Sequence, residues 1–69
     1  MHGRIAGLSQ FGYGFIAADG GQNFFFHRSS LLAASERSFD MLRVGDRVEF
    51  TPDLHAPRGP RASDVRVTG

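Results

Sequence analysis

Short segments of alternating side chains, each ended by turn-forming residues, constrain the fold of this chain more than any other feature. Successive side chains of a strand point to opposite faces, so this pattern predicts strands rather than helices. The second and third segments are joined by Asp19, Gly20 and Gly21, and glycine accepts the backbone angles of a tight hairpin. Five strands are expected, over residues 4–8, 13–18, 23–27, 47–51 and 62–67.

The connection between the third and fourth strands determines the predicted topology. Residues 28–46 are too many for a hairpin, and Leu31, Leu32 and Ala33 are expected to form at most one helical turn. A three-strand meander, a long crossing connection and a final pair of strands favour a Greek-key barrel over a sandwich. The predicted fold class is all-β, a small five-stranded antiparallel Greek-key β-barrel of the OB type. The 69 residues are expected to form one domain, residues 1–69.

The alternation also leaves a surplus of aromatic side chains outside the predicted core. Tyr13, Phe15, Phe25 and His27 fall together on the outer faces of the second and third strands. A soluble protein seldom exposes such a group of rings without a binding role. Eight other residues suffice to fill a barrel of this size: Ile5, Ile16, Phe24, Phe26, Val48, Phe50, Val65 and Val67.

Unpaired nucleobases are the ligands that such a face predicts, because every base has a flat π-face that stacks on an aromatic ring. We therefore expect sequence-tolerant binding of single-stranded RNA or DNA, in which His27 adds an edge hydrogen bond or a further stack. The net charge of +1 does not by itself indicate this function. All eight residues of the Lys and Arg class are Arg, whose planar guanidinium suits phosphate contacts. Four of them are predicted to line the phosphate track: Arg4, Arg28, Arg61 and Arg66.

Enzymatic chemistry finds little support in the sequence. Residues 12–17 match the glycine pattern of dinucleotide-binding proteins, but no βαβ unit surrounds them. His2, His27 and His55 are far apart and cysteine is absent, so no metal site is expected. No order of nucleophile, histidine and acid is recognisable. We expect no catalysis, no cofactor and no small-molecule substrate.

The cellular setting is predicted from two absences in the sequence. A chain without cysteine suits a reducing compartment, so a cytoplasmic location is expected. No segment approaches the roughly 18 apolar residues of a membrane span, and the first residues lack the apolar region of a signal peptide. We expect a soluble protein with no membrane partner.

Two segments resemble the ribonucleoprotein motifs of the cold-shock domain family. Those motifs read approximately Lys-Gly-Phe-Gly-Phe-Ile and Val-Phe-Val-His-Phe, and the chain has FGYGFI at residues 11–16 and FFFHR at residues 24–28. The resemblance implies an OB-type barrel that acts as a nucleic-acid chaperone, binding single strands weakly and reversibly without ATP. Further matches extend it over nearly the whole chain, at residues 4–10, 42–50, 59–60 and 62–67.

The chain departs from the family pattern at several binding positions. Gly7 and Leu8 stand where the first strand of the family has Trp and Phe, so one stacking platform is missing. Phe11 replaces the Lys that opens the first motif. Arg28 replaces the aromatic residue that closes the second, although a guanidinium can itself stack on a base. These changes predict weaker binding than in the family at large.

Two other functions stay open from the sequence. The near-neutral charge and the missing Trp would also suit a protein-interaction module that uses the same face, and a barrel of this size is easily appended to a longer protein as an accessory domain. Residues 29–41 are expected to cover the barrel end or to seat a partner chain. So long a loop permits strand exchange, so both a monomer and a strand-exchanged dimer are possible. No motif distinguishes RNA from DNA.

Overall fold

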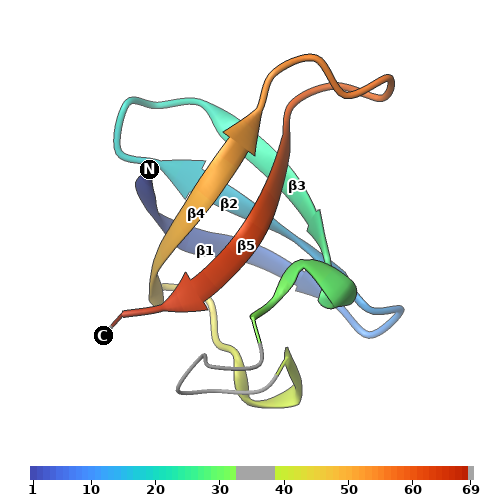
Figure 1. Ribbon diagram of the computed structural model, residues 1–69. Coiled ribbons are helices and arrows are strands. Elements are labelled where there is room, and N and C mark those ends of the chain that lie inside the picture. The colour runs from blue at the N-terminus through green and yellow to red at the C-terminus, as the bar shows by residue number, and fades with distance from the viewer. Residues whose placement is uncertain (33–38, 69) are drawn as a thin grey trace.

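Five strands close into a barrel in the order β1-β2-β3-β5-β4 (Figure 1). The structure is a computed structural model that describes residues 1–32 and 39–68. The predicted all-β class and all five predicted strands are confirmed, and no strand end differs from its predicted position by more than two residues. The strands are β1 (His2–Ser9), β2 (Tyr13–Ala18), β3 (Asn23–His27), β4 (Arg47–Asp53) and β5 (Arg61–Val67).

Four of the five neighbouring strand pairs are antiparallel, and one parallel contact closes the barrel. The predicted hairpin joins β2 to β3, and Gly21 adopts the left-handed angle φ +94° within its turn. The closing contact joins β3 to β5 at Phe25 and Arg61. It places the loop between β4 and β5 beside β3, because the Phe25 N–H donates to the Pro60 carbonyl at 3.1 Å.

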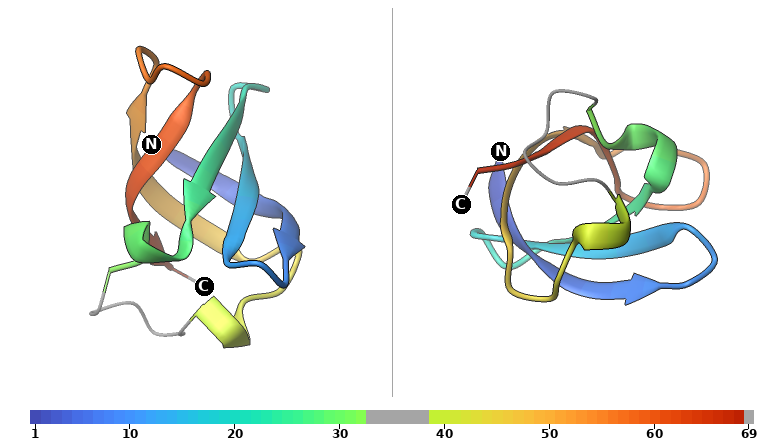
Figure 2. Two further views of the ribbon diagram at one scale, coloured as in Figure 1. Left: turned by 90° about the vertical axis from the view of Figure 1, so that its right-hand side faces the viewer. Right: turned by 90° about the horizontal axis from the view of Figure 1, so that it is seen from below.

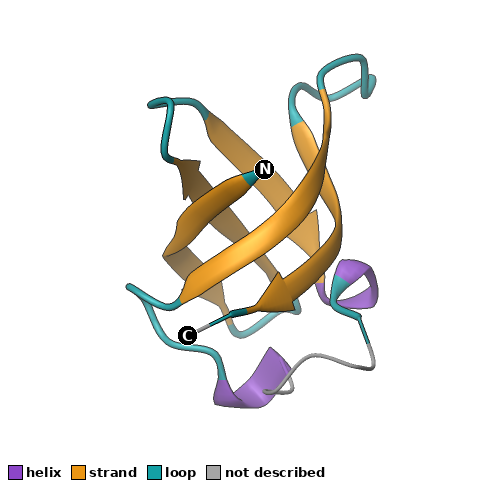
Figure 3. Cartoon of the chain, turned by 60° about the vertical axis from the view of Figure 1, so that its left-hand side comes forward, coloured by secondary structure: helices purple, strands orange, loops and turns teal. Residues whose placement is uncertain are grey.

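The long connection between β3 and β4 contains two short 3-10 turns, η1 (Arg28–Ser30) and η2 (Phe39–Met41). Both lie at the same end of the barrel, where Figure 3 draws them in purple and Figure 2 shows η2 across the opening. Leu31 and Phe39 pack against the core, so the described part of this connection covers one barrel end, as expected. No helix in residues 1–32 and 39–68 has the length and apolar character needed to cross a membrane.

Leu31 and Leu32 form no helical turn, where the sequence predicts at most one. The turn occurs earlier, at η1, and Leu31 is extended and forms a parallel bridge with Val65. The Leu32 N–H donates to the Val65 carbonyl at 2.8 Å. Pairing with β5 thus gives the backbone at Leu31 and Leu32 its hydrogen bonds while the Leu31 side chain packs on the core. A helical turn at these residues would break the pairing with β5 and move Leu31 off the core. Ala33, the third residue of that prediction, lies outside the described residues.

The interior of the barrel holds the eight residues predicted from the alternation, and each of them is buried. Phe24 and Phe26 are fully buried, with ring contacts to Phe50 at 5.1 Å and to Phe39 at 6.0 Å between centroids. Ala18, Leu42 and Ala62 are also buried. The core prediction is confirmed, and Tyr13, Phe15 and Phe25 lie outside this core.

Gly14 allows the Phe26 ring to pack closely against β2. A Cβ atom at this position would lie 2.8 Å from the Gly7 carbonyl oxygen and 2.8 Å from a Phe26 ring carbon. We expect Gly14→Ala to lower the free energy of unfolding by about 1–3 kcal/mol in urea denaturation, because such overpacking displaces side chains or backbone. Gly20→Ala is the matched control, since its Cβ would meet no atom within 4 Å. Equal stability of the two variants would contradict this packing.

Candidate nucleic-acid interface

The outer faces of β2 and β3 carry the ring cluster that the sequence predicts. The strand register places Phe15 opposite Phe25 and Tyr13 opposite His27, so the four side chains share one face, called here the aromatic face. Phe15 is 45% exposed and the other three are half-buried. Their neighbours on the opposite face of β3, Phe24 and Phe26, are fully buried. The alternation therefore separates core rings from surface rings on the same strand.

Three rings of the aromatic face pack on one another. The Phe25 centroid lies 5.6 Å from that of Tyr13 and 5.9 Å from that of Phe15, and the Tyr13 and Phe15 centroids are 6.0 Å apart. The planes of Phe15 and Tyr13 meet at 88°, a favourable edge-to-face arrangement. Mutual packing restricts the rotamers before any ligand arrives, which reduces the entropy lost on binding.

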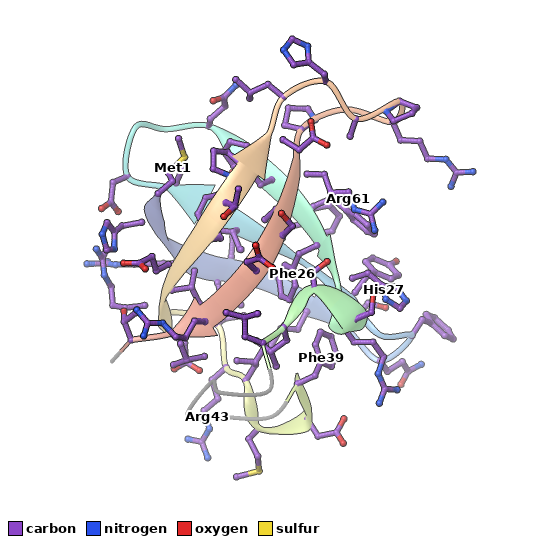
Figure 4. The ribbon with its side chains drawn as sticks, viewed as in Figure 1. Met1, Phe26, His27, Phe39, Arg43 and Arg61 are labelled. Carbon is purple, nitrogen blue, oxygen red and sulfur yellow. The ribbon has the colours of Figure 1, made fainter. Side chains whose placement is uncertain are left out.

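The loop between β4 and β5 forms a groove with three residues of the aromatic face, Phe15, Phe25 and His27. The groove has a volume of about 560 Å³, within the usual range for ligand sites in proteins. Figure 4 shows His27 and Arg61 pointing outward on the same side of the molecule, with Met1 on the opposite side. The groove is lined by Phe15, Phe25, His27, Ala56, Pro57, Arg58, Gly59 and Arg61.

The groove lining contains two arginines and no carboxylate. The Arg61 guanidinium carbon lies 6.0 Å from the Phe25 ring centroid, within cation–π range. Arg58 and Arg61 form no ion pair with any carboxylate among the described residues. Their charge is thus available to an anionic ligand that lies along the rings.

Two arginines elsewhere on the barrel, Arg47 and Arg66, are paired with acids. Arg47 donates two hydrogen bonds of 3.1 Å to Asp19, and this contact lowers the pKa of the Asp19 carboxyl. Arg66 donates to Glu49 at 3.2 Å. A second depression, of about 430 Å³, contains Arg66 together with the carboxylates of Glu49 and Asp64. Its two acids disfavour a polyanion, whereas the groove beside the aromatic face favours one.

His27 presents a defined donor to the groove. Its Nδ1 accepts the Ser29 backbone N–H at 3.1 Å and lies 2.9 Å from the Ser29 hydroxyl oxygen. In the neutral imidazole the proton is therefore on Nε2, because Nδ1 must keep a lone pair for the N–H. Nε2–H is then a donor for a base edge or a phosphate oxygen.

The structure brings most of the predicted site residues together but separates two arginines from the rest. The aromatic face and Arg61 form one surface, and the Arg28 N–H donates to the Gly12 carbonyl at 2.8 Å beside the Tyr13 end of that surface. Arg4 is exposed on β1 opposite Ala17, outside the groove lining. Arg66 lies with Glu49 in the second depression.

Arg58 is a groove residue that sequence reasoning missed. It lies in the loop between β4 and β5, between Pro57 and Gly59, and no strand pattern extends over it. Only the parallel contact of β3 with β5 places it beside Phe25. Among residues 1–32 and 39–68, no three His, Asp or Glu side chains gather in a manner that would hold a metal ion.

Gly7 lies in the same row of the sheet as Phe15 and Phe25. A register shift between Ile5 and Gly7 makes Ala6 a bulge residue and puts Gly7 opposite Phe15. A Cβ at Gly7 would lie 3.8 Å from a Phe15 ring carbon, an ordinary contact distance. The surface beside Phe15 is thus open where a side chain at residue 7 would lie.

Comparison with known proteins agrees with these features. The chain matches the 'Cold-shock' DNA-binding domain family over residues 1–68. It belongs to the cold-shock domain family. Among solved structures, this cold-shock domain is similar to Drosophila Unr CSD456, with a TM-score of 0.74 and 28% identity over 99% of its own length. It spans about a quarter, 26%, of the length of that chain.

The family assignment establishes the general function. Cold-shock domains bind nucleic acid, and the match covers every strand of the barrel, so this domain is a nucleic-acid-binding module. A search of curated proteins gives no match, so the assignment rests on the family match and on the structural similarity.

Proposed function

We propose that this cold-shock domain binds single-stranded nucleic acid by stacking bases on Tyr13, Phe15 and Phe25. One observation carries the proposal: three mutually packed rings line or adjoin a groove that is lined by two arginines and no carboxylate. Stacking requires bases that are unpaired, because the faces of paired bases are covered by their neighbours in the duplex. Phosphates of the same strand are held by Arg28, Arg58 and Arg61, and His27 contacts a base edge or a phosphate.

The expected affinity follows from the number of platforms. Each stacked base contributes about 1–3 kcal/mol, so three platforms give about 3–9 kcal/mol before the strand is ordered. A micromolar dissociation constant corresponds to about 8 kcal/mol. We therefore expect micromolar binding with rapid exchange.

Fluorescence anisotropy of a labelled pyrimidine-rich strand, titrated beside a matched duplex, tests this function. Clear preference for the single strand supports the stacking face. Equal binding of the duplex would indicate that phosphates alone are recognised. An absence of binding at high micromolar protein would favour a protein-interaction module on the same face.

Removal of either groove arginine should reduce the salt dependence of binding. Arg58→Ala and Arg61→Ala should each lessen the slope of log affinity against log salt by about 0.7 for each phosphate that the guanidinium neutralises. Arg66→Ala is the matched control, because Glu49 already neutralises that guanidinium. Anisotropy titrations at several salt concentrations measure the slopes. An equal change in slope for Arg66→Ala would show that phosphates also contact the Arg66 side of the barrel, and would contradict the proposed path along the groove.

Gly7→Trp should strengthen binding by about fivefold or more, the effect of one further stacking platform. The new indole would lie beside Phe15, in the row that continues to Phe25. Gly20→Trp, in the turn between β2 and β3, controls for a general gain from adding an aromatic residue. Unchanged affinity for Gly7→Trp in the same titration would mean that β1 does not contact the strand.

Stacking also supports a nucleic-acid chaperone role that needs no ATP. A protein that binds open strands but not paired ones shifts a hairpin toward the open form by mass action. We expect the domain to lower the melting temperature of a short hairpin labelled with a fluorophore and a quencher, and Phe15→Ala to reduce this effect. Binding of single strands without any change in hairpin melting would contradict the chaperone role and leave only the binding of strands that are already unpaired.

A further inference from the structure

Phe11 is the most exposed large apolar side chain among the described residues, at 78%. It lies in the turn between β1 and β2, and that turn is hydrogen-bonded. The Phe11 N–H donates to the Ser9 hydroxyl at 3.1 Å, and the Gly12 N–H donates to the Ser9 carbonyl at 3.2 Å. The ring is therefore held on an ordered turn and contributes little to the core.

The turn directly continues the aromatic face. Tyr13 and His27 are the last pair of that face, and Gly12 directly precedes Tyr13 at the start of β2. The Gly12 carbonyl accepts the Arg28 N–H at 2.8 Å. The Arg28 side chain packs over this glycine, since a Cβ at Gly12 would lie 3.0 Å from the Arg28 Cδ. Phe11 thus extends from the Tyr13 end of the face, in the turn against which Arg28 packs.

Charge favours a nucleic-acid strand at this end. Arg28 forms no ion pair with a carboxylate among the described residues, as is true of Arg58 and Arg61 at the other end of the face. A strand that runs from the groove across Phe25 and Tyr13 would reach Arg28 next. Its following base would then meet the Phe11 ring.

We propose that Phe11 is an additional stacking platform, which takes one unpaired base beyond the aromatic face and lengthens the bound segment. The inference rests on the proposed function, because the strand must first lie on the aromatic face. A nucleobase fits better than a second copy of the chain. One aromatic side chain buries at most about 250 Å², whereas a stable protein interface needs about 800 Å² on each partner.

A tryptophan at this position reports the contact directly. The chain contains no tryptophan, so Phe11→Trp introduces a single indole fluorophore. Oligothymidylate should quench its emission at the concentrations at which anisotropy reports binding. Val44→Trp is the matched control, because Val44 is 66% exposed in the loop before β4 and away from the groove lining. Its emission should remain unchanged.

Binding of oligothymidylates of different lengths distinguishes the Phe11 platform from those of the aromatic face. Oligothymidylates of about 4 to 10 nucleotides cover the lower part of the range of OB-fold site sizes. Phe11→Ala should leave the affinity for the shortest strands unchanged and weaken the longest by about fivefold to 150-fold, the effect of one stacked base. Phe15→Ala should weaken strands of every length.

The outcomes distinguish the two proposals. Binding of wild type, with no quenching of Phe11→Trp and no loss in Phe11→Ala, would overturn the additional platform and leave the aromatic face intact. An absence of binding at every length would overturn both. A dimer in sedimentation that Phe11→Ala dissociates would show that the ring instead covers a second copy of the chain.

Discussion

Replacing Phe15 and Phe25 together with alanine should weaken the binding of a pyrimidine-rich single strand by about 2–6 kcal/mol and leave the barrel folded. From micromolar binding, such a loss places the dissociation constant in the range of tens of micromolar or far weaker. Both rings lie outside the core, and each offers a platform to a base. Their centroids are 5.9 Å apart, so the two losses are coupled and the double variant measures the pair as a unit.

Anisotropy titration measures this loss, and circular dichroism checks the fold. Val44→Ala removes an exposed apolar side chain away from the groove lining and should bind as the wild type does. Loss of the folded state in the double variant would show that the two rings are structural. Unchanged affinity in a folded double variant would remove the aromatic face from the interface.

Phe26→Ala should lower the free energy of unfolding by about 3–5 kcal/mol, the range for truncation of a buried phenylalanine. The Phe26 ring is fully buried and packs against Phe39 and against the strand at Gly14. A domain of 69 residues has a total stability of about 3–10 kcal/mol at typical values per residue, so much of the stability should be lost.

Phe25, the residue before Phe26, provides the control for this loss of stability. Phe25 lies on the opposite face of β3, and Phe25→Ala should cost only about 1 kcal/mol, because its ring is half-buried rather than enclosed. Urea denaturation of the two variants compares neighbours in sequence that differ in face. Equal destabilisation would contradict the division of β3 into a core side and a binding side.

The alternation of side chains was enough to predict the strands, the core and the aromatic face. The run Phe24, Phe25, Phe26 is the clearest case, because a period of two puts its middle ring on the face opposite the other two whatever the rest of the chain does. The placement of Tyr13, Phe15, Phe25 and His27 on one face is confirmed by the register of β2 and β3. Their part in binding stays a prediction.

Features that depend on irregular or distant backbone were not predictable in the same way. The bulge that turns Gly7 toward Phe15 has no local signature. On β5, Asp64 has a φ of +50° next to a register shift, so Arg61 and Arg66 both point outward. Arg61 pairs with β3, whereas Arg66 reaches Glu49 on β4, because the strand curls around the barrel. From the sequence, both were predicted to line one phosphate track.

The stacking of bases on Tyr13, Phe15 and Phe25 is tested most directly by aromatic NMR spectra recorded during titration with oligothymidylate. Ring currents of a stacked base displace the resonances of the ring beneath it. We expect large displacements for these three rings and small ones for the core rings of Phe24, Phe26 and Phe50. Binding that leaves the three rings undisturbed, or that instead perturbs residues around Glu49 and Arg66, would contradict the proposed interface.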